Sequence, residues 1–137
     1  MDAASANATY LLVLLCLSVV LLLVHILLQG NFATKDRGTA WNAGPRDGDN
    51  EPQSVMAGRA ARASRNYQET YPAFIGLLLA MILTGDSSGF GLFGAAVWLV
   101  ARIVYIPLYL KGIPYVRSLV WLVSLVGLAL MMIALFV

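Results

Sequence analysis

The sequence predicts an all-α integral membrane protein, folded as an up-and-down bundle of four helices. Of its 137 residues, 60% are hydrophobic and 12% are charged, whereas a soluble domain averages about 45–50% and about 25%. The chain contains four apolar runs, and a helix needs about 20 mostly apolar residues to cross the hydrocarbon layer. One long and two short connections separate the runs, so neighbouring helices are expected to be antiparallel. We predict a single domain over residues 1–137.

The first two helices are predicted on either side of a long polar segment. Residues 8–29 contain no formal charge and are long enough to form a transmembrane helix. Residues 30–55 are rich in Gly, Pro, Asn and Asp, so we predict a loop there. The second helix is predicted over residues 56–84, with Ser54 as its N-cap and Pro72 as a local kink. Its first half is polar and its second half apolar.

The third and fourth helices are predicted over residues 90–110 and 115–136, each after a short turn. The amino-terminal tail and the turn at 85–89 contain no Lys or Arg, whereas the first and third connections and the helix starts that follow them are basic. Basic residues flank membrane helices preferentially on the cytoplasmic side. We therefore predict a multi-pass protein with both termini outside and the first and third connections in the cytoplasm.

Composition excludes several other classes of function. The net charge of +2 comes from nine Lys and Arg against seven Asp and Glu, too small an excess for a nucleic-acid partner. The single cysteine, Cys16, cannot form an intrachain disulfide or a cysteine-based metal cluster. The single histidine, His25, has no second ligand in view, so we predict no metal site.

The main candidate site lies in R-A-A-R-A-S-R-N-Y-Q-E-T-Y-P, residues 59–72. At about 100° per residue, its polar side chains share an arc of roughly 120° on one helix face. These side chains are Arg59, Arg62, Arg65, Asn66 and Glu69. Guanidinium groups pair with carboxylates through two parallel hydrogen bonds, and Glu69 suits an ammonium group. The face therefore fits a small ligand that carries carboxylates and an ammonium.

A second interpretation of this face stays open. Arginines at the cytoplasmic end of a span often only reach the lipid headgroups, and Arg65 and Glu69 are spaced to pair with each other. Asn66 and Glu69 lie deeper, toward the apolar half, where polar groups are costly and mostly functional. This depth favours a ligand site.

Polar side chains on the third helix add to the candidate site. Arg102, Tyr105 and Tyr109 share one helix face, and Arg102 needs a partner at that depth, such as Glu69 or a backbone carbonyl. Arg102 suits either a structural ion pair or a ligand contact, and the tyrosines suit either an aromatic belt or a ligand contact.

Arg117 and Ser118 stand near the start of the fourth helix, where the helix dipole favours an anion and disfavours a cation. Arg117 therefore needs another reason to be there. It would bind an anion, stabilise a thiolate or contact the lipid surface.

Two segments carry a family resemblance: residues 59–72, and A-R-I-V-Y-I-P-L-Y-L-K-G-I-P-Y-V-R-S-L-V-W, residues 101–121. They resemble the MAPEG family, the membrane-associated proteins in eicosanoid and glutathione metabolism, and the resemblance covers roughly residues 8–135. Its most specific part is the N-x-x-E-x-x-P core at the start of the second helix. The segment W-N-A-G-P-R-D-G-D, residues 41–49, resembles bacterial members, which implies the bacterial inner membrane.

The resemblance implies a homotrimer among membrane lipids, with glutathione as co-substrate between neighbouring subunits at the cytoplasmic side. The residues that it implies for glutathione binding are Arg62, Arg65, Asn66, Glu69, Arg102, Tyr105 and Tyr109. Arg117 would stabilise the glutathione thiolate, with Ser118 beside it as the second catalytic residue. The implied activity is a detoxifying transferase or peroxidase that acts on lipophilic electrophiles or lipid hydroperoxides.

Two departures argue against prostaglandin synthesis. Tyr105 stands where the family's prostaglandin E synthase has a histidine, and Trp121 stands where it has a tyrosine. The alternative function is a non-catalytic protein on the same fold that binds lipid or a partner. A transporter is disfavoured because the first and fourth helices are apolar almost throughout.

Overall fold

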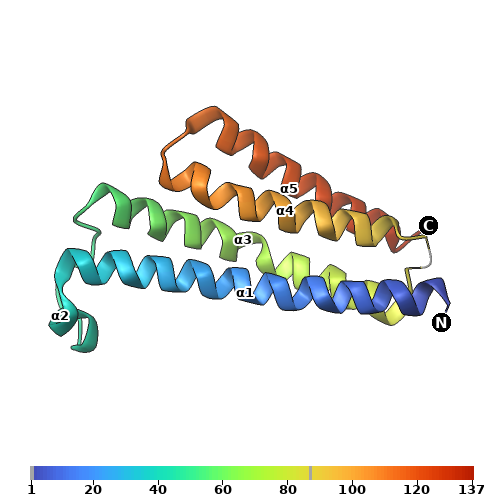
Figure 1. Cartoon of the computed structure of the whole chain (residues 1–137), viewed down its shortest axis with the longest axis horizontal. Helices are drawn as coiled ribbons and strands as arrows, with labels where there is room; N and C mark the ends of the chain where they lie inside the picture. The colour runs from blue at the N-terminus through green and yellow to red at the C-terminus, as the bar shows by residue number, and fades with distance from the viewer. Residues whose placement is uncertain (1, 87) are drawn as a thin grey trace.

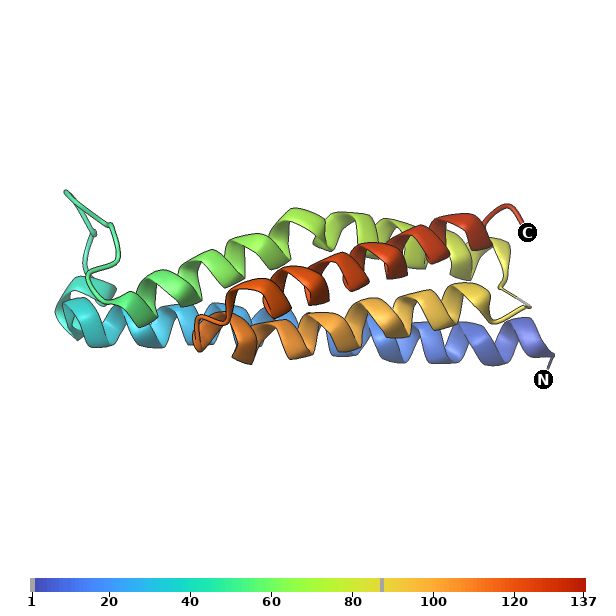
Figure 2. The same ribbon diagram turned by 90° about the horizontal axis from the view of Figure 1, so that it is seen from above.

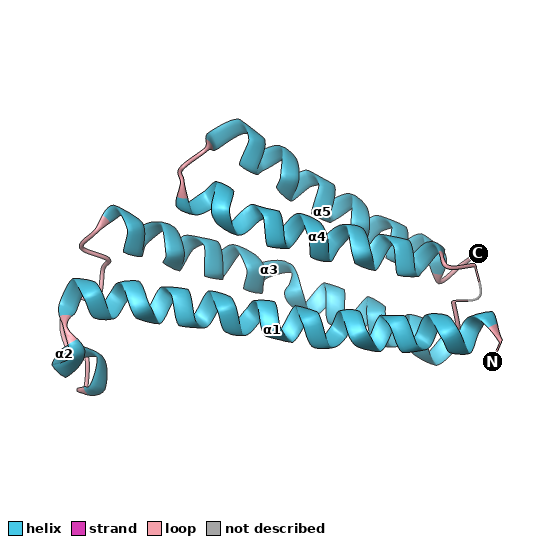
Figure 3. Cartoon of the chain, viewed as in Figure 1, coloured by secondary structure: helices cyan, strands magenta, loops and turns pink. Residues whose placement is uncertain are grey.

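Helices make up most of the chain in a computed structural model that describes residues 2–86 and 88–137 (Figure 3). They are α1 (Ala3–Arg37), α2 (Thr39–Ala43), α3 (Val55–Thr84), α4 (Phe90–Leu110) and α5 (Pro114–Ala134). The described residues contain no strand, which confirms the predicted all-α class. Residue 87, in the predicted turn at 85–89, lies outside the described residues.

The long helices α1, α3, α4 and α5 run alternately in opposite directions along one common axis (Figures 1 and 2). α4 and α5 pack most extensively against each other, and α1 packs mainly against α3. Both termini lie at one end of the molecule (Figure 1). The opposite end, here called the polar end, is formed by residues 30–69 and 105–118. It therefore carries all the lysines and all the arginines except Arg102.

Within the described residues, three helices are long and apolar enough to cross a membrane: α1, α4 and α5. The chain is therefore a membrane protein. α3 is not among the three, because its first half carries Arg59, Arg62, Arg65 and Glu69. That α3 also crosses the membrane stays a prediction.

The helix bounds correct one sequence prediction. Residues 30–37, predicted as loop, continue α1 for two further turns, and α2 occupies 39–43. The polar composition of this extension hides its helical character in the sequence. Thr34 Oγ1 donates a hydrogen bond to the Gly30 carbonyl oxygen at 2.8 Å. Lys35 and Arg37 stand in the last turn of α1, where positive charges interact favourably with the helix dipole. The helix ends at Gly38, whose φ of 90° suits only glycine well.

The start of α3 agrees with the prediction. Ser54 is the N-cap, and its Oγ accepts a hydrogen bond from the Ala57 N–H at 3.1 Å. The helix continues through Pro72 to Thr84, and its ribbon bends near the middle (Figures 1 and 2). A proline inside a helix removes one backbone hydrogen bond and produces such a bend.

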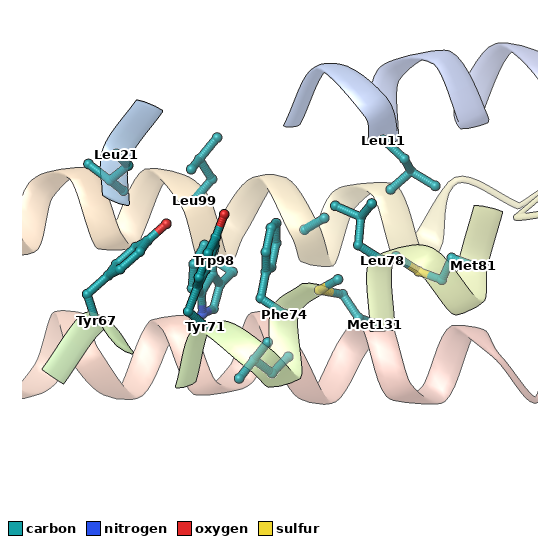
Figure 4. Close-up of a cluster of buried hydrophobic side chains, with 12 residues drawn as sticks. Leu11, Leu21, Tyr67, Tyr71, Phe74, Leu78, Met81, Trp98, Leu99 and Met131 are labelled. Atoms are coloured by element: carbon teal, nitrogen blue, oxygen red, sulfur yellow. The ribbon is translucent and has the colours of Figure 1, made fainter. Parts of the chain in front are cut away.

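Aromatic side chains form the centre of the core. Tyr67, Tyr71 and Phe74 of α3 stand in a row against Trp98 of α4 (Figure 4). The Phe74 and Trp98 ring centroids lie 3.9 Å apart, and those of Tyr67 and Tyr71 lie 4.9 Å apart. The Tyr67 hydroxyl donates to the Ser18 carbonyl of α1 at 2.6 Å. This row fixes the buried face of α3 and leaves its polar face directed away from the core.

Two glycines allow the backbones of α4 and α5 to meet. A Cβ on Gly127 would lie 2.7 Å from the Gly94 carbonyl oxygen and 2.8 Å from the Trp98 nitrogen. Because both are backbone atoms, they cannot rotate away, and the two helices would have to separate. Close approach through small residues is typical of helix pairs in membranes.

We therefore expect Gly127→Ala to lower the free energy of unfolding by about 1–3 kcal/mol, the usual cost of overpacking. Gly76→Ala is the matched control, because nothing lies within 4 Å of a Cβ added there and alanine favours the helix. Thermal unfolding in detergent, followed by circular dichroism, measures both. Equal melting temperatures for the two variants would contradict the tight crossing.

Candidate functional site

The site begins on the polar face of α3. Arg62, Arg65, Asn66 and Glu69 follow one another at the spacing that places side chains on one helix face. The opposite face is buried at Ala60, Ala63 and Tyr67. Because that apolar face packs against α1 and α4, the charged face is directed outward at the polar end.

α4 and α5 complete the site across a tight turn. Tyr105 and Tyr109 stand in the last turns of α4, and Arg117 stands in the first turn of α5. Gly112, with φ of 71°, allows the chain to reverse between them. The turn thus brings side chains from two helices next to the polar face of α3.

A cavity of about 340 Å³ lies between these three helices and is here called the site cavity. Seven side chains line it: Arg62, Arg65, Asn66, Glu69, Tyr105, Tyr109 and Arg117. Three guanidinium groups face one carboxylate, which leaves a formal excess of two positive charges. The structure thus brings together seven of the nine residues that the family resemblance implies for the site.

Arg117 packs on an aromatic ring. Its Cζ lies 4.6 Å from the centroid of Tyr109, and the Tyr109 ring lies 5.5 Å from that of Tyr105. Attraction between a guanidinium and the face of a ring is favourable. This contact offsets the unfavourable helix dipole at the start of α5 and holds the Arg117 guanidinium at the site cavity.

Arg102 lies behind the site cavity and does not line it. The side chain is 0% exposed, and its Nη1 donates to the Asn66 Oδ1 at 2.8 Å. The guanidinium lies over the rings of Tyr67 and Tyr105, at 5.5 Å and 4.5 Å. Its partner is therefore the Asn66 side chain. The sequence instead suggests Glu69 or a backbone carbonyl as the partner. The Nε and Nη2 atoms of Arg102 have no partner among the described residues.

The Arg102 hydrogen bond fixes the orientation of the Asn66 amide. Because the guanidinium only donates, the atom that it contacts must be the amide oxygen. The Asn66 Nδ2, a donor of two hydrogen bonds, is then the group available to the site cavity. Asn66 therefore offers donors to a ligand acceptor.

Ser118 and Arg59 lie outside the site cavity. Ser118 is exposed, and its hydroxyl donates to the Pro114 carbonyl at 3.5 Å. Arg59 donates from Nη1 to the Leu110 carbonyl at 3.1 Å, so it caps the end of α4, where a cation is favourable. Within the part of the chain that the structure describes, no hydrogen bond joins Arg65 to Glu69.

The sequence analysis assigns no site role to Trp41 or Arg46, which the structure places in the wall of a second cavity at the polar end. Both belong to the segment that was predicted as a simple loop. The local signal for these two residues in the sequence is an aromatic side chain and an arginine close to Pro45. Only the folded segment shows that both side chains line a cavity.

Comparison with known proteins decides the family. A family model, the MAPEG family, matches residues 11–137, nearly the whole chain. The chain belongs to the MAPEG family. This confirms the resemblance found in the sequence, and it makes the chain a member of a family of membrane proteins of eicosanoid and glutathione metabolism. Searches of curated proteins and of solved structures gave no match.

Proposed function

We propose that this MAPEG protein is a glutathione-dependent transferase or peroxidase that activates the glutathione thiol in the site cavity. The observation that carries the proposal is the convergence of Arg62, Arg65 and Arg117 with Glu69 in one cavity. Glutathione has two carboxylates and one ammonium group. The guanidinium groups and the carboxylate of the cavity match these charges.

Arg117 is the residue that we propose for activating the thiol. Free thiols are mostly protonated at neutral pH, and the thiolate is the nucleophile. A guanidinium close to the sulfur favours the thiolate by the opposite-charge effect. In the transferase reaction the thiolate attacks a lipophilic electrophile and forms a carbon–sulfur bond, as a leaving group departs with the bonding electrons or a proton adds to the neighbouring atom. In the peroxidase reaction it attacks a lipid hydroperoxide and cleaves the oxygen–oxygen bond, which gives an alcohol and glutathione sulfenic acid. A second glutathione then reduces the sulfenic acid to glutathione disulfide and water.

The remaining polar side chains would bind and orient glutathione. Asn66 offers its Nδ2 donors to a carboxylate or carbonyl oxygen, and Glu69 accepts from the ammonium group. Tyr105 and Tyr109 supply hydroxyl groups, and the Tyr109 ring, which contacts the Tyr105 ring, holds the Arg117 guanidinium. Ser118 has a role only if a ligand draws its exposed hydroxyl toward the site cavity.

We further propose that the chain is a homotrimer of four-helix bundles, with α3 as a fourth span. In the single chain, Arg62, Arg65 and Glu69 are exposed, so the site cavity is open on one side. A neighbouring subunit against α3 would close it and exclude water from the thiolate. We place the polar end in the cytoplasm, because basic residues favour that side, and both termini on the other side of a bacterial inner membrane.

The test is an ultraviolet thiolate difference spectrum of the purified full chain in detergent, recorded as glutathione is added near neutral pH. A saturable thiolate signal is expected, because binding and ionisation are coupled through Arg117. A folded, trimeric protein that gives no signal would overturn the proposal. It would instead favour the non-catalytic protein that binds lipid or a partner.

A further inference from the structure

A second cavity of about 610 Å³ lies at the polar end, between α1, α2, α3 and the segment 44–54; we call it the loop cavity. Its volume falls within the range of small-molecule sites, about 300–1,000 Å³. Small side chains on the two long helices, Ala33 of α1 and Ala57 and Ala61 of α3, leave this space open. The loop cavity is larger than the site cavity and has a separate lining, except for Arg65.

The segment 44–54 is held over the loop cavity by hydrogen bonds to the end of α1. Asp36 Oδ2 accepts the backbone N–H groups of Gln53 and Ser54 at 3.0 and 2.9 Å. Arg37 donates from Nη2 to the Glu51 carbonyl. The wall of the cavity is therefore a folded structure, in contrast to a freely moving linker.

The charges of the loop cavity favour an anion. Arg37, Arg46 and Arg65 line it together with the carboxylates of Asp36 and Glu51. The Asp36 carboxylate already accepts two backbone hydrogen bonds, whereas each guanidinium has five N–H donors. Arg65 donates no hydrogen bond to any described residue. The donors that remain free therefore exceed the free acceptors.

Two of these cations pack against the same aromatic ring. The guanidinium carbons of Arg37 and Arg46 lie 5.0 Å and 5.1 Å from the centroid of the Trp41 ring. Arg46 also donates to the Asn42 carbonyl from Nε at 3.0 Å and from Nη2 at 2.9 Å. Both guanidinium groups are thus held in place at the cavity wall before any ligand binds.

The backbone of Arg46 gives an independent reason to look for a role of its side chain. Its φ is 57°, in the left-handed region that glycine adopts freely and other residues adopt at a cost. The residue follows Pro45 in the irregular segment 44–54, at a position where glycine would be relaxed. An arginine at this position is explained if its guanidinium is needed at the cavity.

The loop cavity also spans the boundary between apolar and polar surroundings. The continuous apolar run of α1 ends at Leu28, and Ile26 and Gln29 line the cavity at that level. Trp41, Arg37 and Arg46 lie further toward the polar end. A ligand that fills the whole cavity therefore has an apolar part and an anionic part.

We propose that the loop cavity binds an anionic amphiphile. Its acid group would lie at Arg37, Arg46 and Arg65, and its hydrocarbon part would lie along Ile26 and the small side chains of α1 and α3. Fatty carboxylates and anionic phospholipids share this chemistry. The site stands apart from glutathione chemistry, although Arg65 in the wall of both cavities couples the two ligands.

The test uses 2-bromododecanoate, whose bromine stands next to the acid group and quenches indole fluorescence on contact, with the full chain in neutral detergent and no glutathione. Subtracting the signal of Trp41→Phe isolates Trp41 from Trp98 and Trp121. Saturable quenching of Trp41 is expected for the carboxylate, and its methyl ester is expected to bind at least tenfold more weakly, because a charged partner is lost. Equal, unsaturable quenching by both compounds would overturn the proposal.

Two variants probe the site from different sides. Arg46→Gly relaxes the backbone and removes the guanidinium, so a stably folded variant with about tenfold weaker binding is expected. Ala61→Leu places a larger side chain in the loop cavity, so the saturable quenching of Trp41 fluorescence is expected to disappear. Ala96→Leu is the matched control, because Ala96 lines a separate apolar groove between α4 and α5. Unchanged binding in Arg46→Gly, with the fold verified by circular dichroism, would contradict the anion site.

Nanodiscs distinguish the two sources of the amphiphile. Quenching of Trp41 by an anionic phospholipid that is brominated close to its headgroup, and not by its zwitterionic counterpart, would identify a lipid headgroup. Quenching by the free carboxylate alone would identify a fatty acid. No quenching by either would overturn the proposal. Because glutathione is absent throughout, the result is independent of the thiolate titration.

Discussion

Arg117→Ala is expected to lower the glutathione thiolate signal by about tenfold while the protein stays folded and assembled. The Arg117 guanidinium is the cation of α5 that lines the site cavity, and it is fixed there by the Tyr109 ring at 4.6 Å. An opposite charge within about 4–6 Å of an ionisable group shifts its ionisation equilibrium by about tenfold or more. The thiolate fraction at neutral pH should therefore fall by about tenfold, and turnover with a lipophilic electrophile should fall with it.

Lys111→Ala is the matched control for Arg117→Ala. It removes one positive charge from the same end of the molecule, but Lys111 does not line the site cavity. The thiolate signal should be unchanged in this variant, because exposed charges are screened by water and salt. A comparable loss in both variants would mean that general electrostatics, and not Arg117, ionises the thiol.

Arg117→Lys separates charge from geometry. The ammonium keeps the charge but loses the planar fork that stacks on Tyr109. We expect part of the thiolate signal to return relative to Arg117→Ala. Full activity in the alanine variant would remove Arg117 from the mechanism altogether.

Local periodicity explains why much of the site was predictable from the sequence. Arg62, Arg65, Asn66 and Glu69 fall on one face by helical spacing alone, and all four line one cavity. Tyr109 and Arg117 belong to other helices, and the family resemblance is what places them with α3. Spacing within a helix indicates a shared face, whereas contacts between helices depend on how the apolar faces pack.

The sequence predictions that the structure corrects are those that depend on contacts between segments far apart in the chain. The partner of Arg102 is the Asn66 side chain one helix away, and no pattern within α4 identifies it. Residues 30–37 look like a loop by composition, but they form helix because the end of α1 is joined to the segment 44–54 through Asp36 and Arg37. The loop cavity is formed in part by the folded segment 44–54, so the pattern of the sequence alone does not predict it.

Arg102→Met is expected to weaken glutathione binding by about tenfold without lowering stability. The guanidinium is fully buried, and two of its nitrogens have no partner among the described residues. A buried charge with unpaired donors is costly, so an apolar side chain of similar length is expected to leave the melting temperature unchanged or raise it. Binding should weaken because Asn66 loses the donor that fixes its amide orientation.

A double-mutant cycle with Asn66→Ala tests whether Arg102 acts through Asn66 or touches glutathione itself. If Arg102 only positions the Asn66 amide, Arg102→Met has little further effect on the glutathione Kd once Asn66 is alanine. Independent contacts with the ligand would instead give additive losses, because separate interactions contribute separately to the binding free energy. Isothermal titration of glutathione into the two single variants and the double variant measures the coupling. Additive losses would show that the buried guanidinium reaches the ligand, and the site cavity would then have to extend past Asn66 when glutathione binds.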